Sequence, residues 1–74
     1  MESIKTKGKY GTIYYKNKYG KLHRENGPAI LDYDGTKEWF INGVRHREDG
    51  PAIEIQDQYN FWYLDGFEYT EKDF

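Results

Sequence analysis

The sequence predicts an all-β repeat protein, and three observations support this fold class. Gly20, Gly43 and Gly66 lie at a constant spacing of 23 residues. The octad His23 to Ile30 (HRENGPAI) recurs as His46 to Ile53 (HREDGPAI) at the same spacing, with a single substitution. Eight Tyr, four Phe and two Trp occur in 74 residues, and aromatic side chains favour strands. One supersecondary unit has therefore been copied and stacked along the chain.

The first elements are predicted by alternation and by turn residues. Lys5, Lys7 and Lys9 alternate with other residues, which predicts an edge strand over residues 4–9 with the lysines on one side. Lysine on an edge also opposes aggregation between sheets. A second strand is expected at Tyr10–Lys16, a turn at Asn17–Gly20 and a returning strand at Lys21–His23.

Three Asx-Gly pairs predict the tight turns of the remaining units: Asp34-Gly35, Asn42-Gly43 and Asp65-Gly66. Such pairs between β-forming residues favour type I′ turns, in which both central residues have positive φ. Strands are expected at Pro28–Tyr33, Lys37–Ile41, Val44–His46, Ala52–Gln56 and Phe61–Leu64, a loop at Arg47–Gly50 and a further turn near Asp57–Asn60. The chain forms one repeat domain over 1–74, with units at about 10–27, 28–50 and 51–74.

Alternation within the strands assigns side chains to two faces. Trp39 and Ile41 point one way, as do Trp62 and Leu64, and this Trp/aliphatic face is the expected core. The aromatic residues on the opposite face are the predicted partner-binding surface: Phe40, Phe61 and Tyr63. The alternative is that residues 67–74, ending in Phe74, or the N-terminal segment fold back over this face.

The first unit departs from the other two. At the 23-residue offset from Trp39 it offers Lys16. Either this unit is a polar cap with Lys16 and Lys18, or a one-residue insertion shifts Tyr15 into the tryptophan position.

The motif Asn42 to His46 (NGVRH), the following Gly50, and Asp34-Gly35 ahead of Trp39 resemble the MORN repeat. The longer pattern N-G-x-x-H-R-E-D-G-P-A-I is similar to a variant in uncharacterised proteins of large DNA viruses, phages and bacteria. Arg24 and Arg47 stand where the MORN pattern has glycine. The resemblance implies consecutive hairpins that form a single elongated, twisted antiparallel sheet, and a scaffolding or recognition role without catalysis.

The repeated ionisable residues are expected to be structural. His23 and His46, with Glu25 and Glu48, are predicted to brace the Gly-Pro loops by hydrogen bonds, because an enzyme rarely duplicates its acid and base one repeat apart. A metal shared by the two histidines is not expected, because residues two strands apart lie roughly 9–10 Å apart. With no cysteine and only Ser3 as serine, no nucleophile, cofactor or metal is expected.

Charge is distributed unevenly and leaves a second function open. Residues 1–24 carry seven Lys and Arg against one acid, and residues 25–74 carry four against twelve. The alternative function is a nucleotide- or nucleic-acid-binding module, in which tyrosines stack on bases and cations contact phosphate. The cations concerned are Lys16, Lys18, Lys21, Arg24 and Arg47.

The first prediction for function is a non-enzymatic module for protein–protein interaction. The resemblance suggests a phage- or virus-encoded inhibitor or adaptor that acts on a host defence factor, cytoplasmic in the host cell. No run is long or apolar enough for a signal peptide or a membrane span. A monomer is expected, or a weak homodimer that pairs through an edge strand near residues 4–9 or 67–74.

Overall fold

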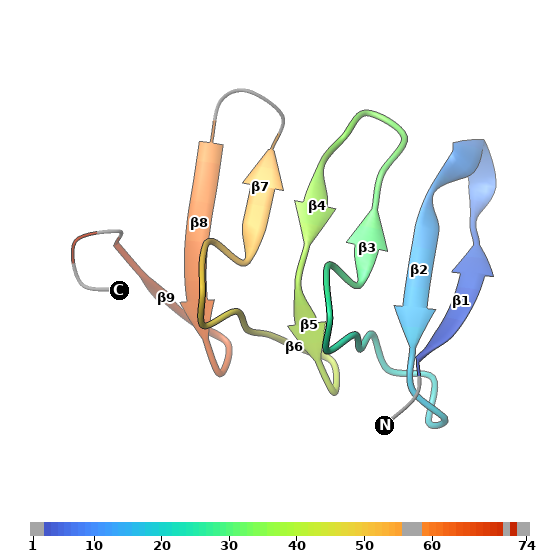
Figure 1. Cartoon of the computed structure of the whole chain (residues 1–74), viewed down its shortest axis with the longest axis horizontal. Coiled ribbons are helices and arrows are strands. Elements are labelled where there is room, and N and C mark those ends of the chain that lie inside the picture. Colours follow the sequence, from blue (N-terminus) through green and yellow to red (C-terminus); the bar gives the residue numbers. More distant parts are fainter. Residues whose placement is uncertain (1–2, 56–58, 71, 73–74) are drawn as a thin grey trace.

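The structure, a computed structural model, describes residues 3–55, 59–70 and 72. One short 3₁₀ turn, η1 (Lys9–Gly11), accompanies nine strands in this part of the chain. Figure 1 shows most of these strands side by side. The strands are β1 (Ile4–Lys7), β2 (Ile13–Lys16), β3 (Ile30–Leu31), β4 (Lys37–Glu38), β5 (Phe40–Ile41), β6 (Val44–Arg45), β7 (Ile53–Ile55), β8 (Tyr59–Leu64) and β9 (Phe67–Tyr69).

Seven of these strands form one antiparallel sheet in the order β1-β2-β3-β4-β7-β8-β9, and β5 pairs with β6 in a small second sheet. The molecule measures 34 × 26 × 16 Å, which is consistent with a single layer that is longer than it is thick. The prediction of an all-β antiparallel sheet is confirmed.

The strand predicted over Lys37–Ile41 is interrupted at Trp39. On the N-terminal side of Trp39, β4 pairs with β7, and on its C-terminal side β5 pairs with β6. Between β6 and β7 the chain leaves the sheet over residues 46–52, so the partner strand changes at Trp39. The Trp39 N–H donates to Ala52 O (2.7 Å), and the Trp39 carbonyl accepts from His46 N (3.2 Å). A sequence pattern that is continuous along one strand does not reveal such a change of partner.

Two of the three Asx-Gly turns form as predicted. Asn42 and Gly43 have φ of 49° and 83°, and Asp65 and Gly66 have 51° and 84°, as a type I′ turn requires. The prediction for Asp34-Gly35 is wrong, because only Gly35 has positive φ and the turn spans Asp32 to Thr36. There the Thr36 N–H donates to the Asp34 carboxylate (3.0 Å), which lowers the pKa of Asp34.

Several predicted strands are shorter than expected. The segment predicted to begin a strand at Tyr10 starts with η1, where Tyr10 has φ 60° and Gly8 N donates to Thr12 O (2.7 Å). Pro28–Tyr33 is reduced to β3, and Lys21–His23 to a single bridge between Lys16 and Leu22. The predicted turn near 57–60 lies partly outside the described residues.

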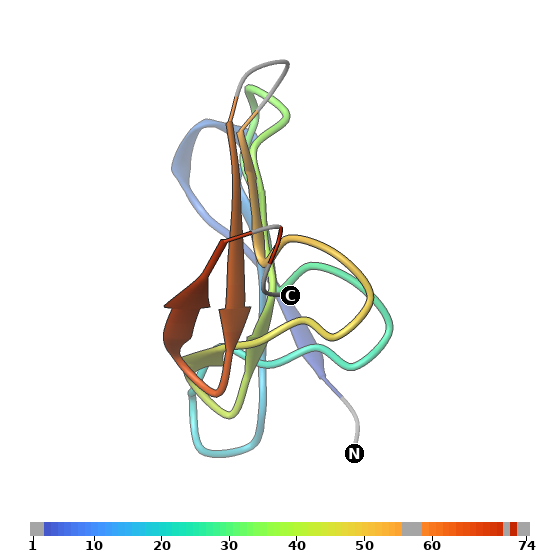
Figure 2. The same cartoon turned by 90° about the vertical axis from the view of Figure 1, so that its left-hand side faces the viewer.

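Two loops protrude from one side of the sheet, as Figure 2 shows. They are the octads His23–Ile30 and His46–Ile53, named here the octad loops. Because paired residues of antiparallel strands share a face, the strand register assigns every strand residue to one side. The loop face carries Ile13, Leu31, Lys37, Glu54 and Asn60, and the opposite face, named here the open face, carries Thr6, Tyr14, Ile30, Glu38, Ile53 and Phe61.

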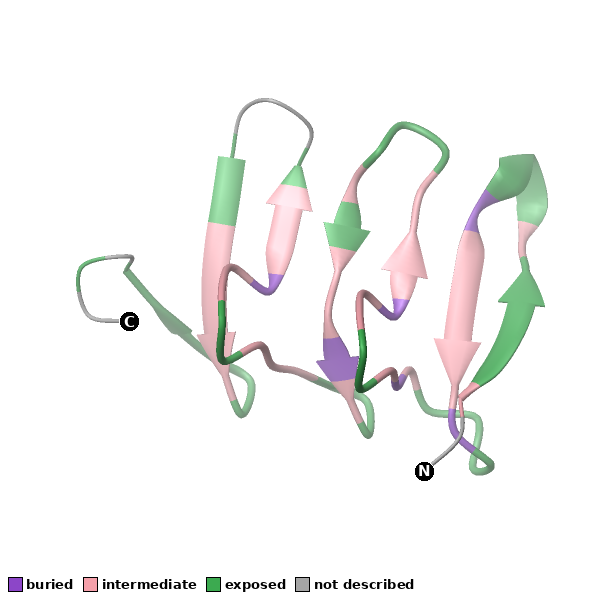
Figure 3. Cartoon of the chain, viewed as in Figure 1, coloured by how far each residue is buried: buried purple, intermediate pink, exposed green. Residues whose placement is uncertain are grey.

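Burial is concentrated where the octad loops rejoin the sheet, whereas β1 and β9 at the two ends are exposed (Figure 3). The buried apolar residues are Ala29, Ala52 and Phe40, of which Phe40 is 8% exposed. The prediction that Trp39 lies in the core and Phe40 on an exposed surface is therefore wrong for this pair, because the Arg45 guanidinium lies 5.2 Å from the Phe40 ring centre. Trp39 is half-buried.

Two segments were predicted as alternative covers of the open face, the N-terminal segment and residues 67–74. The N-terminal segment does not lie across that face, since β1 pairs with β2 at the edge of the sheet. Of the predicted C-terminal cover, residues 67–69 form β9, which pairs with β8 at the other edge of the sheet, and Phe74 lies outside the described residues.

Candidate functional site: the octad loops and the open face

The octads occupy equivalent positions, and this decides between the two interpretations of the first unit. Tyr15 N donates to Ala29 O (2.8 Å), as Trp39 N does to Ala52 O (2.7 Å). The carbonyls of Tyr15 and Trp39 accept from the N–H of His23 and His46 respectively. Tyr15 therefore takes the tryptophan position, one residue earlier than the 23-residue spacing predicts.

The extra residue lies in the turn that follows β2. Asn17 N donates to Lys21 O (2.8 Å), and the Asn17 side-chain oxygen accepts from the N–H groups of Tyr19 (2.9 Å) and Lys21 (3.0 Å). This turn is longer than the two-residue turns at Asn42-Gly43 and Asp65-Gly66. The insertion lengthens the turn and leaves the strand register intact.

Each histidine fastens the hairpin turn of the next unit. The N–H of Asn42 donates to Nδ1 of His23 (2.9 Å), and the N–H of Asp65 donates to Nδ1 of His46 (2.9 Å). An accepting Nδ1 is unprotonated, so the neutral rings carry their proton on Nε2. The prediction that the histidines form hydrogen bonds with the Gly-Pro loops is wrong, because each histidine links its own unit to the next one.

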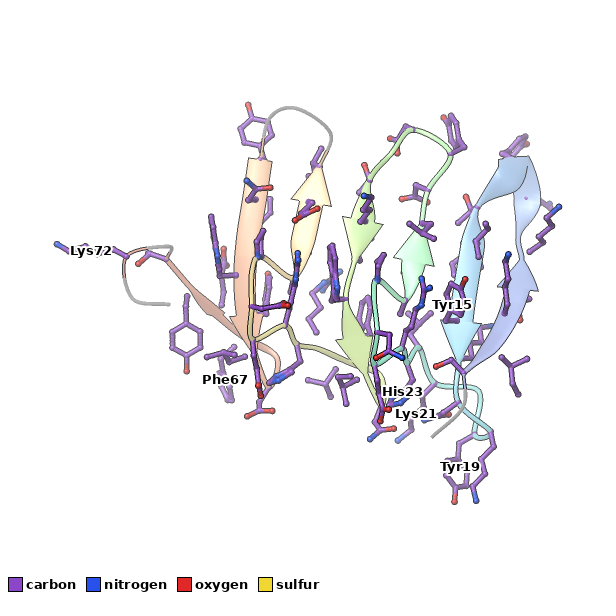
Figure 4. All side chains as sticks on the ribbon, in the orientation of Figure 1. Tyr15, Tyr19, Lys21, His23, Phe67 and Lys72 are labelled. Atoms are coloured by element: carbon purple, nitrogen blue, oxygen red, sulfur yellow. The ribbon has the colours of Figure 1, made fainter. Side chains whose placement is uncertain are left out.

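The carboxylates predicted to accompany the histidines lie beside Nε2. In the second octad the Glu48 carboxylate is 3.1 Å from Nε2 of His46. In the first octad Glu25 is 3.8 Å from Nε2 of His23, a buried atom without a hydrogen bond among the described residues. Figure 4 labels His23 between Tyr15 and Lys21.

The arginines, and not the histidines, hold the Gly-Pro loops. The guanidinium of Arg24 lies 3.9 Å from the Tyr15 ring centre and donates to Pro28 O (3.2 Å). That of Arg47 lies 3.8 Å from the Trp39 ring centre and donates to Pro51 O (3.0 Å). A Cβ at Gly27 or Gly50 would come within 3.2 or 2.8 Å of the guanidinium carbon, so a side chain there would require the arginine to shift from its loop.

The two arginines differ in their acidic partners. Arg47 donates through Nε to Asp49 (2.9 Å) and through a terminal nitrogen to Glu54 (2.8 Å). At the equivalent positions the first octad and β3 carry Asn26 and Leu31. No carboxylate pairs with Arg24 within residues 3–55, 59–70 and 72.

A groove of about 800 Å³ lies between the two octad loops on the loop face. One wall is formed by the first octad loop and the other by the second, and Trp39 and Ile41 lie between them. The lining residues are Arg24, Glu25, Asn26, Gly27, Trp39, Ile41, His46, Arg47, Glu48 and Asp49.

The cations predicted to contact phosphate do not form one surface. Lys16 lies on the open face with its ammonium 5.8 Å from the Tyr14 ring centre, whereas Arg24 and Arg47 lie on the loop face. Lys18 stacks on Tyr19 (5.2 Å) and Lys21 packs against Gly43, both at the lower turns. Figure 4 shows Tyr19 pointing away from the sheet there.

Phe61 and Tyr63 share the open face with Ile53 and are half-buried. The Arg45 guanidinium lies 5.6 Å from the Tyr63 ring centre and donates to Glu38 (2.9 Å), so this ion pair lies among the aromatic rings. The sequence reasoning missed Tyr59, which is 58% exposed and pairs with Ile55 on the same face. Tyr59, Phe61 and Tyr63 alternate along the sequence, and this alternation indicates that Tyr59 shares the face of the other two.

The described residues contain neither a membrane-spanning helix nor a metal-binding cluster. No helix among them is long and apolar enough to span a membrane. No three His, Asp or Glu side chains in this part of the chain cluster so as to hold a metal ion.

Comparison with known proteins adds no relationship: no family model, curated protein or solved structure matches the chain.

Proposed function

We propose that this chain is a non-enzymatic protein-binding module whose contact surface is the open face at β7 and β8. The residues of this surface are Ile53, Ile55, Tyr59, Phe61 and Tyr63. One observation carries the proposal: these side chains line one side of a single-layer sheet whose protruding loops lie on the other side (Figure 2). Aromatic residues on an uncovered sheet face are typical of protein contact sites.

The composition of the surface suits a protein partner. Interfaces combine a centre of aromatic and aliphatic side chains with a polar rim, and arginine is enriched in them. Here the Arg45–Glu38 ion pair lies beside Phe40 and Tyr63, and Tyr59 and Ile55 form an exposed margin. Phe40 is buried, so it is not among the proposed contact residues.

The nucleic-acid alternative has less support. Binding along a phosphate backbone needs cations that follow one groove together with stacking platforms. Arg47 is already engaged by two carboxylates, and Lys16 lies on the opposite face from Arg24. The role suggested by the resemblance, an inhibitor or adaptor directed at a host defence factor, belongs to the protein-binding proposal.

Site-specific photo-cross-linking tests this proposal. A benzoylphenylalanine placed at Tyr59 is expected to form a cross-linked product with a host protein, because the side chain lies on the margin of the contact surface. Tyr33 is the matched control, since it is 76% exposed but lies in the turn between β3 and β4. The readout is the mass and identity of the cross-linked product after denaturing purification.

The proposal is supported if the variant labelled at residue 59 captures a protein that the variant labelled at residue 33 does not, and if an excess of unlabelled protein prevents this capture. Equal capture at residues 33 and 59, or capture at residue 33 alone, contradicts it. If capture at 59 is removed by nuclease, the contact depends on nucleic acid and the alternative function is correct.

A further inference from the structure

We propose that Arg24, in the groove between the octad loops, binds a carboxylate side chain from an acidic segment of a partner protein. This is a second contact surface, on the loop face, and it is separate from the open face. The proposal rests on a comparison between the two octads of the same chain.

The second octad shows what this loop does with an arginine when acids are present. The guanidinium of Arg47 lies on Trp39 and against Gly50, and its donors reach Asp49, Glu54 and Pro51 O. The ring and the loop hold the guanidinium in one orientation, and its planar set of donors matches carboxylate geometry.

The first octad repeats this arrangement without the acids. Arg24 lies on Tyr15, packs against Gly27 and donates to Pro28 O. Asn26 and Leu31 replace the two carboxylate residues. The guanidinium is therefore oriented in advance. No carboxylate among residues 3–55, 59–70 and 72 completes its hydrogen bonds as in the second octad, and in this proposal a partner supplies one.

The surroundings select a carboxylate on a protein over a nucleic-acid backbone. The Arg24 guanidinium is positively charged and has no carboxylate partner among the described residues, which favours an anionic ligand. The facing wall of the groove carries Glu48 and Asp49, and Glu25 lies beside Arg24. These acids repel a run of phosphates along the groove more strongly than they repel one carboxylate placed at Arg24. Leu31 adds an apolar contact where Glu54 stands in the second unit.

The groove has room for a short segment around the carboxylate. Its volume of about 800 Å³ lies within the range of ligand sites, and Trp39 and Ile41 supply apolar surface. The ligand predicted by these contacts is an extended segment with Asp or Glu next to an apolar residue.

Nuclear magnetic resonance of the arginine Nε–Hε groups tests the proposal. The probe is the peptide acetyl-Leu-Glu-Leu-amide, with acetyl-Leu-Gln-Leu-amide as its neutral control and octathymidylate as the nucleic-acid probe. We expect a saturable shift of the Arg24 signal with the Glu peptide, at least tenfold weaker binding of the Gln peptide, and no saturable shift at Arg47.

Two double variants exchange the sites between the octads. Asn26→Asp with Leu31→Glu supplies the first octad with its own acids and is expected to abolish the Arg24 response. Asp49→Asn with Glu54→Leu removes the acids of the second octad and is expected to make Arg47 respond. Circular dichroism verifies that each variant is folded.

Three results would overturn the proposal: an Arg24 signal that does not respond to the Glu peptide, equal binding of the Glu and Gln peptides, or tighter binding of octathymidylate at Arg24. If one double variant does not fold, the other still distinguishes a site defined by missing acids from a general basic surface. The cross-linking at residue 59 does not involve Arg24, so either proposal can fail alone.

Discussion

His23→Ala is expected to lower the free energy of unfolding by about 3 kcal/mol, the largest effect of any single side-chain removal. His23 is 2% exposed and is the largest fully buried side chain among the described residues. Its removal leaves a cavity and takes the acceptor away from the Asn42 N–H, and both losses are destabilising. For a domain of this size the melting temperature should fall by roughly 10–25 °C.

His46→Ala is the matched control for this substitution. The ring accepts an equivalent hydrogen bond from Asp65 N–H but is 19% exposed, so water can replace it. A loss of about 1 kcal/mol is expected. The two values are measured by thermal and denaturant unfolding, with amide exchange at Asn42 and Asp65 as the local readout. Equal losses for the two histidines would contradict the larger contribution assigned to the buried His23.

Gly43→Val is expected to destabilise the protein by about 2 kcal/mol, since a β-branched residue is strained at positive φ. Gly43 has φ 83° and its N–H donates to Leu22 O (2.7 Å), so the turn also contacts the preceding unit. The side chain of Lys21 lies 3.5 Å from the position of an added Cβ, an ordinary contact distance, and the further atoms of a branched side chain would have to fit beside it.

Two control variants separate backbone strain from loss of space. Gly43→Asn should be tolerated much better, because asparagine adopts left-handed backbone conformations more readily than valine. Lys37→Ala, at an exposed strand position, should change stability by less than about 0.5 kcal/mol. The measurement is the unfolding midpoint in urea. A Gly43→Val midpoint equal to that of Lys37→Ala would show that the type I′ turn is not needed.

The features that could be predicted from sequence are those that depend on local residues or on the repeat. The 23-residue spacing and the Asn42-Gly43 and Asp65-Gly66 turns predict hairpins, because type I′ turns depend on two adjacent residues. Asp34-Gly35 failed because the Asp32 N–H and the Asp34 carboxylate both bond to Thr36, which favours a longer turn.

The features that could not be predicted depend on contacts between units. The partner of His23 is 19 residues away in sequence, and nothing in the octad specifies that the ring reaches the next hairpin. The burial of Phe40 depends on Arg45, which covers its ring from across the same hairpin, while the Phe40 carbonyl accepts from Arg24 N of the preceding unit. Alternation assigns a side chain to a face but does not say which face is covered.

The sequence shows where the two octads differ, but it does not show that the differing residues surround one arginine. Asn26 against Asp49 is visible as the only difference between the two octads, and Leu31 against Glu54 lies just beyond them. That both positions surround one arginine follows only from the fold, in which Glu54 on β7 lies beside the octad loop.

The central claim, that the open face at β7 and β8 binds a protein, is tested most directly by the affinity of variants for the cross-linked partner. Calorimetric titration should give a dissociation constant roughly thirtyfold higher for Tyr63→Ala, with an unchanged circular dichroism spectrum, because truncating an aromatic anchor costs about 2 kcal/mol. Tyr33→Ala is expected to bind as the wild type does. If Tyr63→Ala binds normally while changing Lys16 and Lys18 to Glu abolishes binding, the contact surface lies at the basic end of the sheet and the claim is wrong.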